Sequence, residues 1–175
     1  MMGKKSKDKF RRGYIFLDWE NLWKNLENFL SSSYERFSPK DWLNRLIEQI
    51  GQEEGQVIKV YVFVPLHLAS SWAETFYNLG FFTIACPKIR GKAGEEIDTT
   101  DRTLMSFAET LIDETRELTF ICIGSGDQDF IPLANKARDR GLRVIAAVAS
   151  WGSLSSEFGK KVKKTYLFSP TVEGI

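Results

Sequence analysis

The chain has 175 residues, 43% of them hydrophobic and 13% aromatic, which is enough for one domain with a substantial core. A Ser-His-Asp triad or a Cys-His pair would have to use the single histidine, His67, and no apolar stretch approaches the ~20 residues of a membrane-spanning helix. We therefore expect a soluble cytoplasmic protein in which carboxylates and a hard metal ion carry any chemistry.

The net charge of +1 conceals basic ends and an acidic body. Residues 1–12 contain six Lys or Arg and one Asp, and KKVKK occupies residues 160–164. Basic segments commonly follow phosphate backbones, but solvated tails that keep a protein soluble fit this pattern equally. We divide the chain into a basic N-terminal arm, residues 1–12, and a single domain, residues 13–175.

Apolar runs rich in β-branched and aromatic residues alternate with helical patterns along the first half of the chain. Strands are predicted at residues 14–17, 57–64 and 81–86, and helices at 22–30, 39–50 and 69–79. Ser38 and Pro39 mark a helix start, Pro65 ends a strand and Gly80 closes a helix. A polar loop, PKIRGKAGEE, follows at residues 87–96.

The same alternation continues to the end of the chain. Helices are predicted from Asp98 to about Thr115, from Asp129 to Gly141 and at 153–162, with strands at 118–123, 142–148 and 165–168. Five buried strands separated by helices imply a mostly parallel sheet covered on both faces, because parallel strands need crossover connections. The fold class is therefore a three-layer α/β/α sandwich with a mostly parallel five-stranded sheet.

Both cysteines, Cys86 and Cys122, lie in runs that are predicted to be buried strands. This position indicates small core residues rather than a disulfide or a metal pair. A reducing compartment is consistent with it.

Aspartates follow two of the predicted strands and start one of the helices. Asp18 comes directly after the first strand, and Asp127 and Asp129 follow residues 118–123 across a Gly-Ser-Gly turn. The carboxyl ends of parallel strands gather at one edge of a sheet, so these acids should lie together. Asp98 and Asp101, three residues apart at a helix start, share one helical face.

Crowded carboxylates repel one another unless a positive charge lies among them. With oxygen ligands available, Mg²⁺ or Mn²⁺ is the expected ion, and such ions can activate water for attack on a phosphodiester. Each of these aspartates could instead cap a helix. Three chain segments that deliver acids toward one edge favour the metal site over three separate caps.

Five further residues are candidates for contacts to a phosphate or a nucleic acid. They are Asn21, Ser125, Lys88, Arg90 and Lys92. The ordinary alternatives are helix capping for the asparagine, a turn for the serine and a solvated charged loop for the three cations. Of the five tryptophans, Trp19 beside Asp18 is a candidate for base stacking, and the others favour core packing.

Two segments of the chain resemble the NYN domains, PIN-like nucleases related to LabA-like proteins. YIFLDWENLW resembles the family's first strand, which ends in an Asp followed three residues later by an Asn, here Asp18 and Asn21. GSGDQDFIPLANKARDRGLRVIAA resembles its second signature, a Ser/Gly turn, an Asp-x-Asp-Phe and a helix that ends at a Gly. The resemblance runs from Tyr14 to about Val148, and residues 153–168 resemble the closing helix and strand.

The resemblance implies a PIN-like fold with strand order 3-2-1-4-5 and metal-dependent cleavage of RNA. It carries over Asp18, Asp98 and Asp127 first, and Asp129, Asp101 and Asn21 after them. The chain departs from the family where it has Glu95-Glu96-Ile97-Asp98 in place of Lys-Gly-Val-Asp. It also has Leu104 where a second acid often stands, and Asp101 is the candidate to substitute for that acid.

The leading hypothesis is a ribonuclease that depends on Mg²⁺ or Mn²⁺. Its catalytic acids would be Asp18, Asp98, Asp127 and Asp129, and its metal ligands Asp18, Asp98, Asp101 and Asp127. One alternative is an RNA-binding or protein-interaction module with a weakened nuclease site, and another is a metal-dependent hydrolase of small phosphate esters. The expected partner is RNA, without a membrane, and a homodimer is left open.

Overall fold

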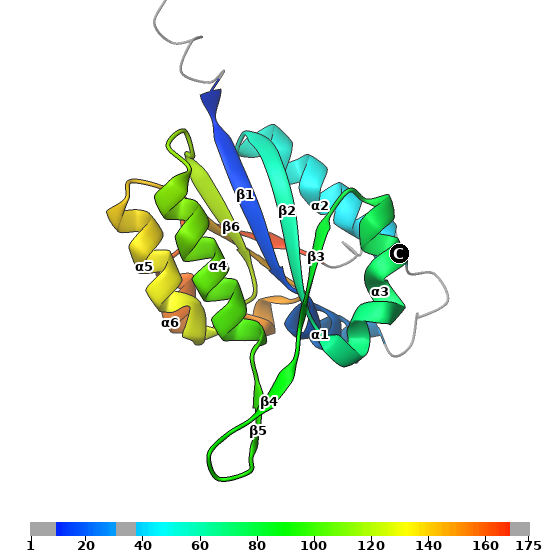
Figure 1. Ribbon diagram of the computed structural model, residues 1–175. Coiled ribbons are helices and arrows are strands. Elements are labelled where there is room, and N and C mark those ends of the chain that lie inside the picture. Colours follow the sequence, from blue (N-terminus) through cyan, green and yellow to red (C-terminus); the bar gives the residue numbers. More distant parts are fainter. Residues whose placement is uncertain (1–9, 31–37, 169–175) are drawn as a thin grey trace, which may run out of the picture.

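A parallel sheet of six strands forms the centre of the protein (Figure 1). The computed structural model describes residues 10–30 and 38–168. The strands are β1 (Arg12–Asp18), β2 (Gln56–Pro65), β3 (Phe82–Cys86), β6 (Phe120–Gly124), β7 (Arg143–Val148) and β8 (Lys164–Leu167). They lie in the order β3-β2-β1-β6-β7-β8, and every neighbouring pair is parallel.

The predicted order 3-2-1-4-5 is confirmed for the first five of these strands, but the predicted count of five is wrong. The short strand β8 joins the sheet as a sixth member, where Tyr166 pairs with Ala147 of β7. Tyr166 is 2% exposed and its hydroxyl donates a hydrogen bond of 2.7 Å to the buried Glu54. Burial of this large side chain explains why so short a segment remains in the sheet.

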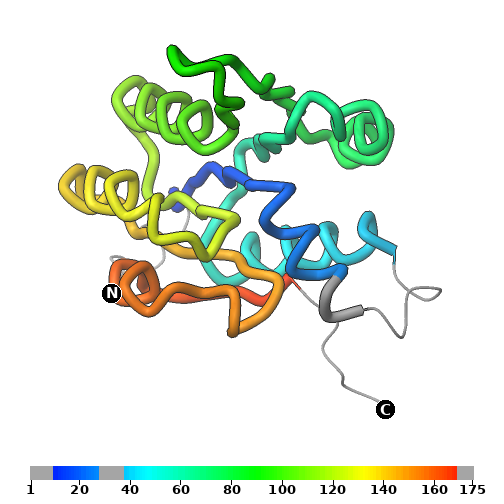
Figure 2. Tube along the Cα trace, turned by 90° about the horizontal axis from the view of Figure 1, so that it is seen from below, coloured from blue at the N-terminus to red at the C-terminus, as the bar shows by residue number. Residues whose placement is uncertain are grey.

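Helices cover both faces of the sheet, as the three-layer prediction requires (Figure 2). One face carries α1 (Trp19–Leu30), α2 (Pro39–Glu53) and α3 (Leu66–Asn78), and the other carries α4 (Thr100–Glu114), α5 (Ile131–Asp139) and α6 (Ser156–Gly159). Alternation along β1 sends Ile15 and Leu17 into the first core and Phe16 into the second. Cys86 and Cys122 are buried and free, which confirms their predicted place in the core.

Local sequence explains where several helices begin. Ser38 caps α2 by accepting the backbone N–H of Asp41, and Pro39 occupies its first turn. The predicted closing helix at 153–162 is wrong in length, because only residues 156–159 form α6 after the 3₁₀ turn η4 (Trp151–Ser153). Leu154 is extended between the two, and Ser155 starts the new helix by accepting the N–H of Phe158.

The segment predicted as a polar loop contains an antiparallel hairpin instead. Its strands are β4 (Lys88–Arg90) and β5 (Glu96–Asp98), and it projects beyond the carboxyl edge of the main sheet (Figure 1). Gly94 at φ +81° supplies the tight turn, which suits a residue without a Cβ. Because Asp98 pairs with Lys88 in this hairpin, α4 begins at Thr100 and not at Asp98 as expected.

The basic ends fall partly outside the described residues. Residues 1–9 of the expected arm are among those not described, and Arg12, its last residue, is the first residue of β1. In the KKVKK segment, Lys164 lies at the amino end of β8 and forms an ion pair of 2.8 Å with Glu53.

None of the helices within residues 10–30 and 38–168 has the length and apolar character needed to cross a bilayer. The cytoplasmic location stays a prediction.

Candidate metal centre

Three carboxylates converge at the carboxyl edge of the sheet. Asp101, Asp127 and Asp129 each offer an oxygen atom, and these atoms lie within 4.8 Å of one another. Asp101 comes from the first turn of α4, and the other two from the turn between β6 and α5, which contains the 3₁₀ helix η3 (Gln128–Phe130). Carboxylate oxygens are the ligands that Mg²⁺ and Mn²⁺ prefer, so this donor set fits such an ion.

The Gly-Ser-Gly turn after β6 holds Asp127 and Asp129 in place through backbone hydrogen bonds. Ser125 is fully buried and its hydroxyl accepts the N–H of Asp127 at 3.2 Å. The Oδ1 atom of Asp127 in turn accepts the N–H of Asp129 at 2.9 Å. A Cβ on Gly126 would overlap the carbonyl oxygen of Ser153, so only glycine allows this turn to pack against the chain there.

Asp18 lies behind this group, at the end of β1. Its side chain is buried, the residue being 5% exposed, and its Oδ1 atom accepts the backbone N–H of Asn21 at 3.4 Å. Burial, followed by the charge of Asp101, raises the pKa of Asp18 to about 8. The carboxyl groups of Asp18 and Asp101 interact, and this contact acts to lower the pKa of Asp101.

The charge of the group also affects Asp101. Partial burial and the neighbouring carboxylates of Asp127 and Asp129 raise the pKa of Asp101 to about 6. Like charges thus repel one another at this edge of the sheet, and a proton or a cation relieves the repulsion. This is the electrostatic condition that a metal site requires.

Asp98 does not belong to the group of three, although the family resemblance places it among the first acids to be carried over. Its Oδ1 atom accepts the backbone N–H of Thr100 at 2.8 Å, which fixes the start of α4. Burial acts to raise the pKa of Asp98, but this bond and the charges of Lys88 and Lys24 lower it. The structure therefore places Asp98 among cations and Asp101 among acids.

The other predicted contact residues lie on α1, on the β4–β5 hairpin and in the turn after β6. Asn21 lies in the first turn of α1, where its backbone binds Asp18 and its carbonyl accepts the Asn25 amide at 2.8 Å. Lys88 and Arg90 are exposed on β4, and Lys92 is exposed in the hairpin turn. Ser125 supports the turn from inside, as described above.

Lys24 is a residue that the sequence analysis missed. It forms an i,i+4 ion pair with Glu20 on α1, and this hydrogen bond, with the charges of Glu20, Asp98 and Asp18, raises the pKa of Lys24. Its position three residues after Asn21, on the same helical face, was the available signal. Lys24 and Lys88 thus approach Asp98 from two separate elements.

Trp19 cannot stack on a base, contrary to the expectation for it. Its side chain is completely buried, and its ring centroid lies 4.9 Å from that of Trp72 and 5.1 Å from that of Phe76. The chain turns from β1 into α1 at this residue, and that turn points the indole into the core between α1 and α3.

The sheet order and the acids at its carboxyl edge define a PIN-like nuclease type of domain. The family model of the NYN domain matches residues 12–169, and the chain belongs to this family. NYN domains are generally nucleases, and such nucleases usually use divalent metals. No protein of curated function matches the sequence.

The fold also matches a solved structure, that of VPA0982, a protein of unknown function from Vibrio parahaemolyticus. The TM-score is 0.67 at 14% sequence identity, over 91% of this chain and 94% of the other. A second structure, Sir2Tm bound to a propionylated peptide, reaches a TM-score of 0.41 at 10% identity, over 95% of this chain and 92% of the other, and carries no argument. The first match supports the fold alone.

Proposed function

We propose that the chain is a ribonuclease that depends on Mg²⁺ or Mn²⁺ and hydrolyses phosphodiester bonds at the carboxyl edge of its sheet. The convergence of Asp101, Asp127 and Asp129, with the buried Asp18 beside Asp101, carries this proposal. Membership of the NYN family supports the same reaction class.

The aspartates have different roles in this proposal. Asp101, Asp127 and Asp129 hold the ion, and Asp18 orients Asp101 and adds a further negative charge once it loses its proton. When bound, a divalent ion lowers the pKa of water and offsets the charge that develops on the phosphodiester. Asp98 serves as a positioning residue, because it caps the first turn of α4 that carries Asp101.

Cations beside the acids supply contacts for the RNA backbone. Lys24 on α1 and Lys88 on β4 flank Asp98, and Arg90 and Lys92 extend the row along the hairpin. Asn21 offers an amide at the rim of the site. Phosphate contacts of this kind position a strand without reading its sequence.

One observation favours the alternative of an RNA-binding or protein-interaction module with little cleavage. Leu104 stands where the family often has a second acid, and it is completely buried in the core under α4. It offers no ligand, so the site has fewer acids than the family pattern unless Asp101 replaces the missing one. A hydrolase of small phosphate esters is the remaining alternative, since the same acids would serve it.

A metal-titrated cleavage assay on mixed RNA tests the proposal. We expect cleavage with Mn²⁺ or Mg²⁺, none with EDTA, and a loss of about a hundredfold or more in Asp127→Asn. Asp139→Asn, at the exposed end of α5, is the matched control and should cleave like the wild type. Salt-sensitive RNA binding without cleavage in any metal would establish the RNA-binding module. Hydrolysis of small phosphate esters alone would establish the small-ester hydrolase.

A further inference from the structure

Among the described elements, the edge strand β3 has no helix packed on it on the face of the sheet that carries α4, α5 and α6. On this face α4 lies over β1 and β2, whereas α3, the helix that packs on β3, lies on the opposite face. A row of rings therefore runs outward from the core. Phe16 is buried and stacks on Tyr61 at 5.8 Å, and Tyr61 contacts Phe82 at 5.6 Å, whose side chain is 49% exposed.

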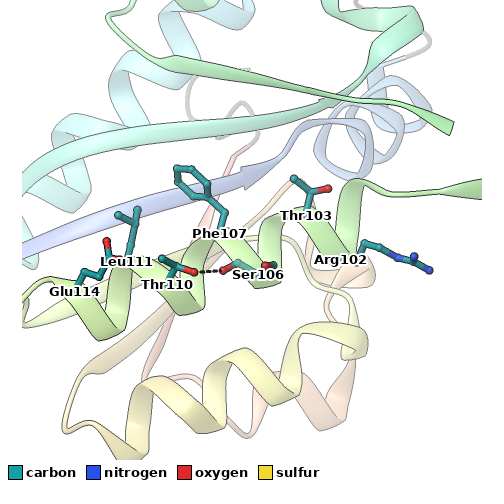
Figure 3. Close-up of a pocket in the computed structure, with 7 residues that line it drawn as sticks. All are labelled: Arg102, Thr103, Ser106, Phe107, Thr110, Leu111 and Glu114. Atoms are coloured by element: carbon teal, nitrogen blue, oxygen red, sulfur yellow. Dashed lines mark hydrogen bonds between the residues drawn. The ribbon is translucent and has the colours of Figure 1, made fainter. Parts of the chain in front are cut away.

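A hollow of about 730 Å³ runs along the flank of α4 (Figure 3). Phe107 forms its inner wall, and the ring lies 4.8 Å from that of Tyr61. The middle of the hollow has the small side chains of Ser106 and Thr110, where the Thr110 hydroxyl donates to the Ser106 carbonyl at 3.0 Å. Small residues at this place allow another helix to come close.

Opposite charges stand at the two ends of the hollow. Arg102 lies at the end nearer the acidic group and Glu114 at the far end, about 18 Å away along α4 at 1.5 Å per residue. Both are exposed, and neither has an ion-pair partner within the described part of the chain. A helix with such ends is complementary to itself in antiparallel orientation.

We propose that this hollow is the interface of a homodimer, in which α4 of a second copy lies antiparallel against α4 and covers the exposed side of β3. A two-fold axis near Ala108 brings Arg102 against Glu114 of the second copy, and repeats the contact at the other end. The same axis sets Ser106 against Thr110 of the second copy. Phe82 and Tyr61 then lose contact with water under the added helix.

The charges of the hollow favour a second copy of the chain over an RNA strand as its occupant. A surface for RNA carries clustered cations, whereas the hollow has one arginine and one glutamate at opposite ends. The nearest lysine on the sheet, Lys59, lies over the ring of Phe82 at 4.6 Å from its centroid. Balanced charges at a fixed spacing fit a copy of the same helix better than a polyanion.

Sedimentation equilibrium of the full chain tests the interface through a charge swap. We expect a dimer at micromolar concentrations, and a dissociation constant at least about tenfold higher for Arg102→Glu and for Glu114→Arg, since each substitution disturbs two symmetric contacts. The double variant Arg102→Glu/Glu114→Arg restores both contacts with their signs exchanged. It should therefore recover most of the lost affinity.

Two further measurements keep the outcome decisive. Circular dichroism and thermal unfolding confirm that each variant is folded, and Asp139→Arg at the exposed end of α5 is a charge control that should leave the dimer intact. A wild type that is monomeric at about 100 μM would overturn the proposal. A double variant as weak as the single ones would overturn it too, as would a monomer in which Arg102→Glu lowers RNA affinity. The sedimentation results do not depend on the ribonuclease proposal.

Discussion

The carboxyl groups of Asp18 and Asp101 interact, and this contact joins the end of β1 to the first turn of α4. Burial and the charge of Asp101 raise the pKa of Asp18 to about 8. The pKa of Asp101 is raised to about 6, mainly by burial and the carboxylates of Asp127 and Asp129. The metal-free site is therefore partly protonated at neutral pH.

Metal affinity should rise with pH, because a cation must displace the protons that Asp18 and Asp101 retain. Between pH 6 and pH 8 we expect the affinity for Mn²⁺ to increase by about tenfold or more, with release of protons. Isothermal titration calorimetry in two buffers of different ionisation enthalpy measures both quantities. An affinity that is constant over this range would show that these two groups do not titrate on binding.

Asp18→Asn should stabilise the metal-free protein, and more so at pH 8 than at pH 5. The unfolded chain loses the Asp18 proton near pH 3.8, while the folded protein holds it until about pH 8, so folding stability falls as pH rises through this window. We expect a gain of about 1–3 kcal/mol at pH 8 in EDTA, which corresponds to a Tm higher by about 3–10 °C. The control Asp139→Asn should change the Tm little, and a lower Tm for Asp18→Asn at pH 8 would refute the assignment.

Gly126→Ala should distort the turn that carries Asp127. Its Cβ would overlap the carbonyl oxygen of Ser153 and lie 2.8 Å from the Cα of Leu154, and neither backbone atom can rotate away. We expect a loss of about 1–3 kcal/mol of unfolding free energy and weaker Mn²⁺ binding. Gly51→Ala in α2 is the control, because its Cβ meets nothing within 4 Å and alanine should add up to about 1 kcal/mol.

Glu54→Gln should destabilise the fold without affecting the metal centre. Glu54 is 4% exposed at the amino edge of the sheet, and it accepts hydrogen bonds from Arg143 at 2.6 and 3.2 Å and from Tyr166 at 2.7 Å. Loss of the buried charge leaves Arg143 without its partner, at a cost of about 2–3 kcal/mol by urea unfolding. Mn²⁺ affinity should stay within about twofold of the wild type, and a larger change would mean that the two edges are coupled.

Periodicity and punctuation predicted most of the sheet. The runs at 14–17, 57–64 and 118–123 are apolar because both faces of a parallel sheet are covered, and such runs are readable from sequence. The hairpin was missed because its strands are only three residues long and mostly charged. Its signal was there in Ile89 and Ile97, which stand symmetrically about the Gly91–Gly94 turn and pair across it.

The same hairpin explains why the choice between Asp98 and Asp101 could not be made from sequence. Motif position favours Asp98, but β5 extends through this residue, and its carboxylate is used to start α4. In the first turn of α4, Asp101 is the residue whose carboxylate lies close to those of Asp127 and Asp129. Asp18, Asp127 and Asp129 follow directly on buried strands or on the turn after one, and this position led to their prediction as site residues. Only the tertiary structure shows which of their carboxylates lie close together.

Titration of Mn²⁺ into the wild type, Asp101→Asn and Asp98→Asn tests most directly whether acids from α4 and the β6–η3 turn hold one divalent ion. Calorimetry at pH 8 should show one site in the wild type, with affinity lowered about tenfold or more by Asp101→Asn and less than about threefold by Asp98→Asn. A wild type that binds no Mn²⁺, or a site that survives Asp101→Asn but is lost in Asp98→Asn, would contradict the account.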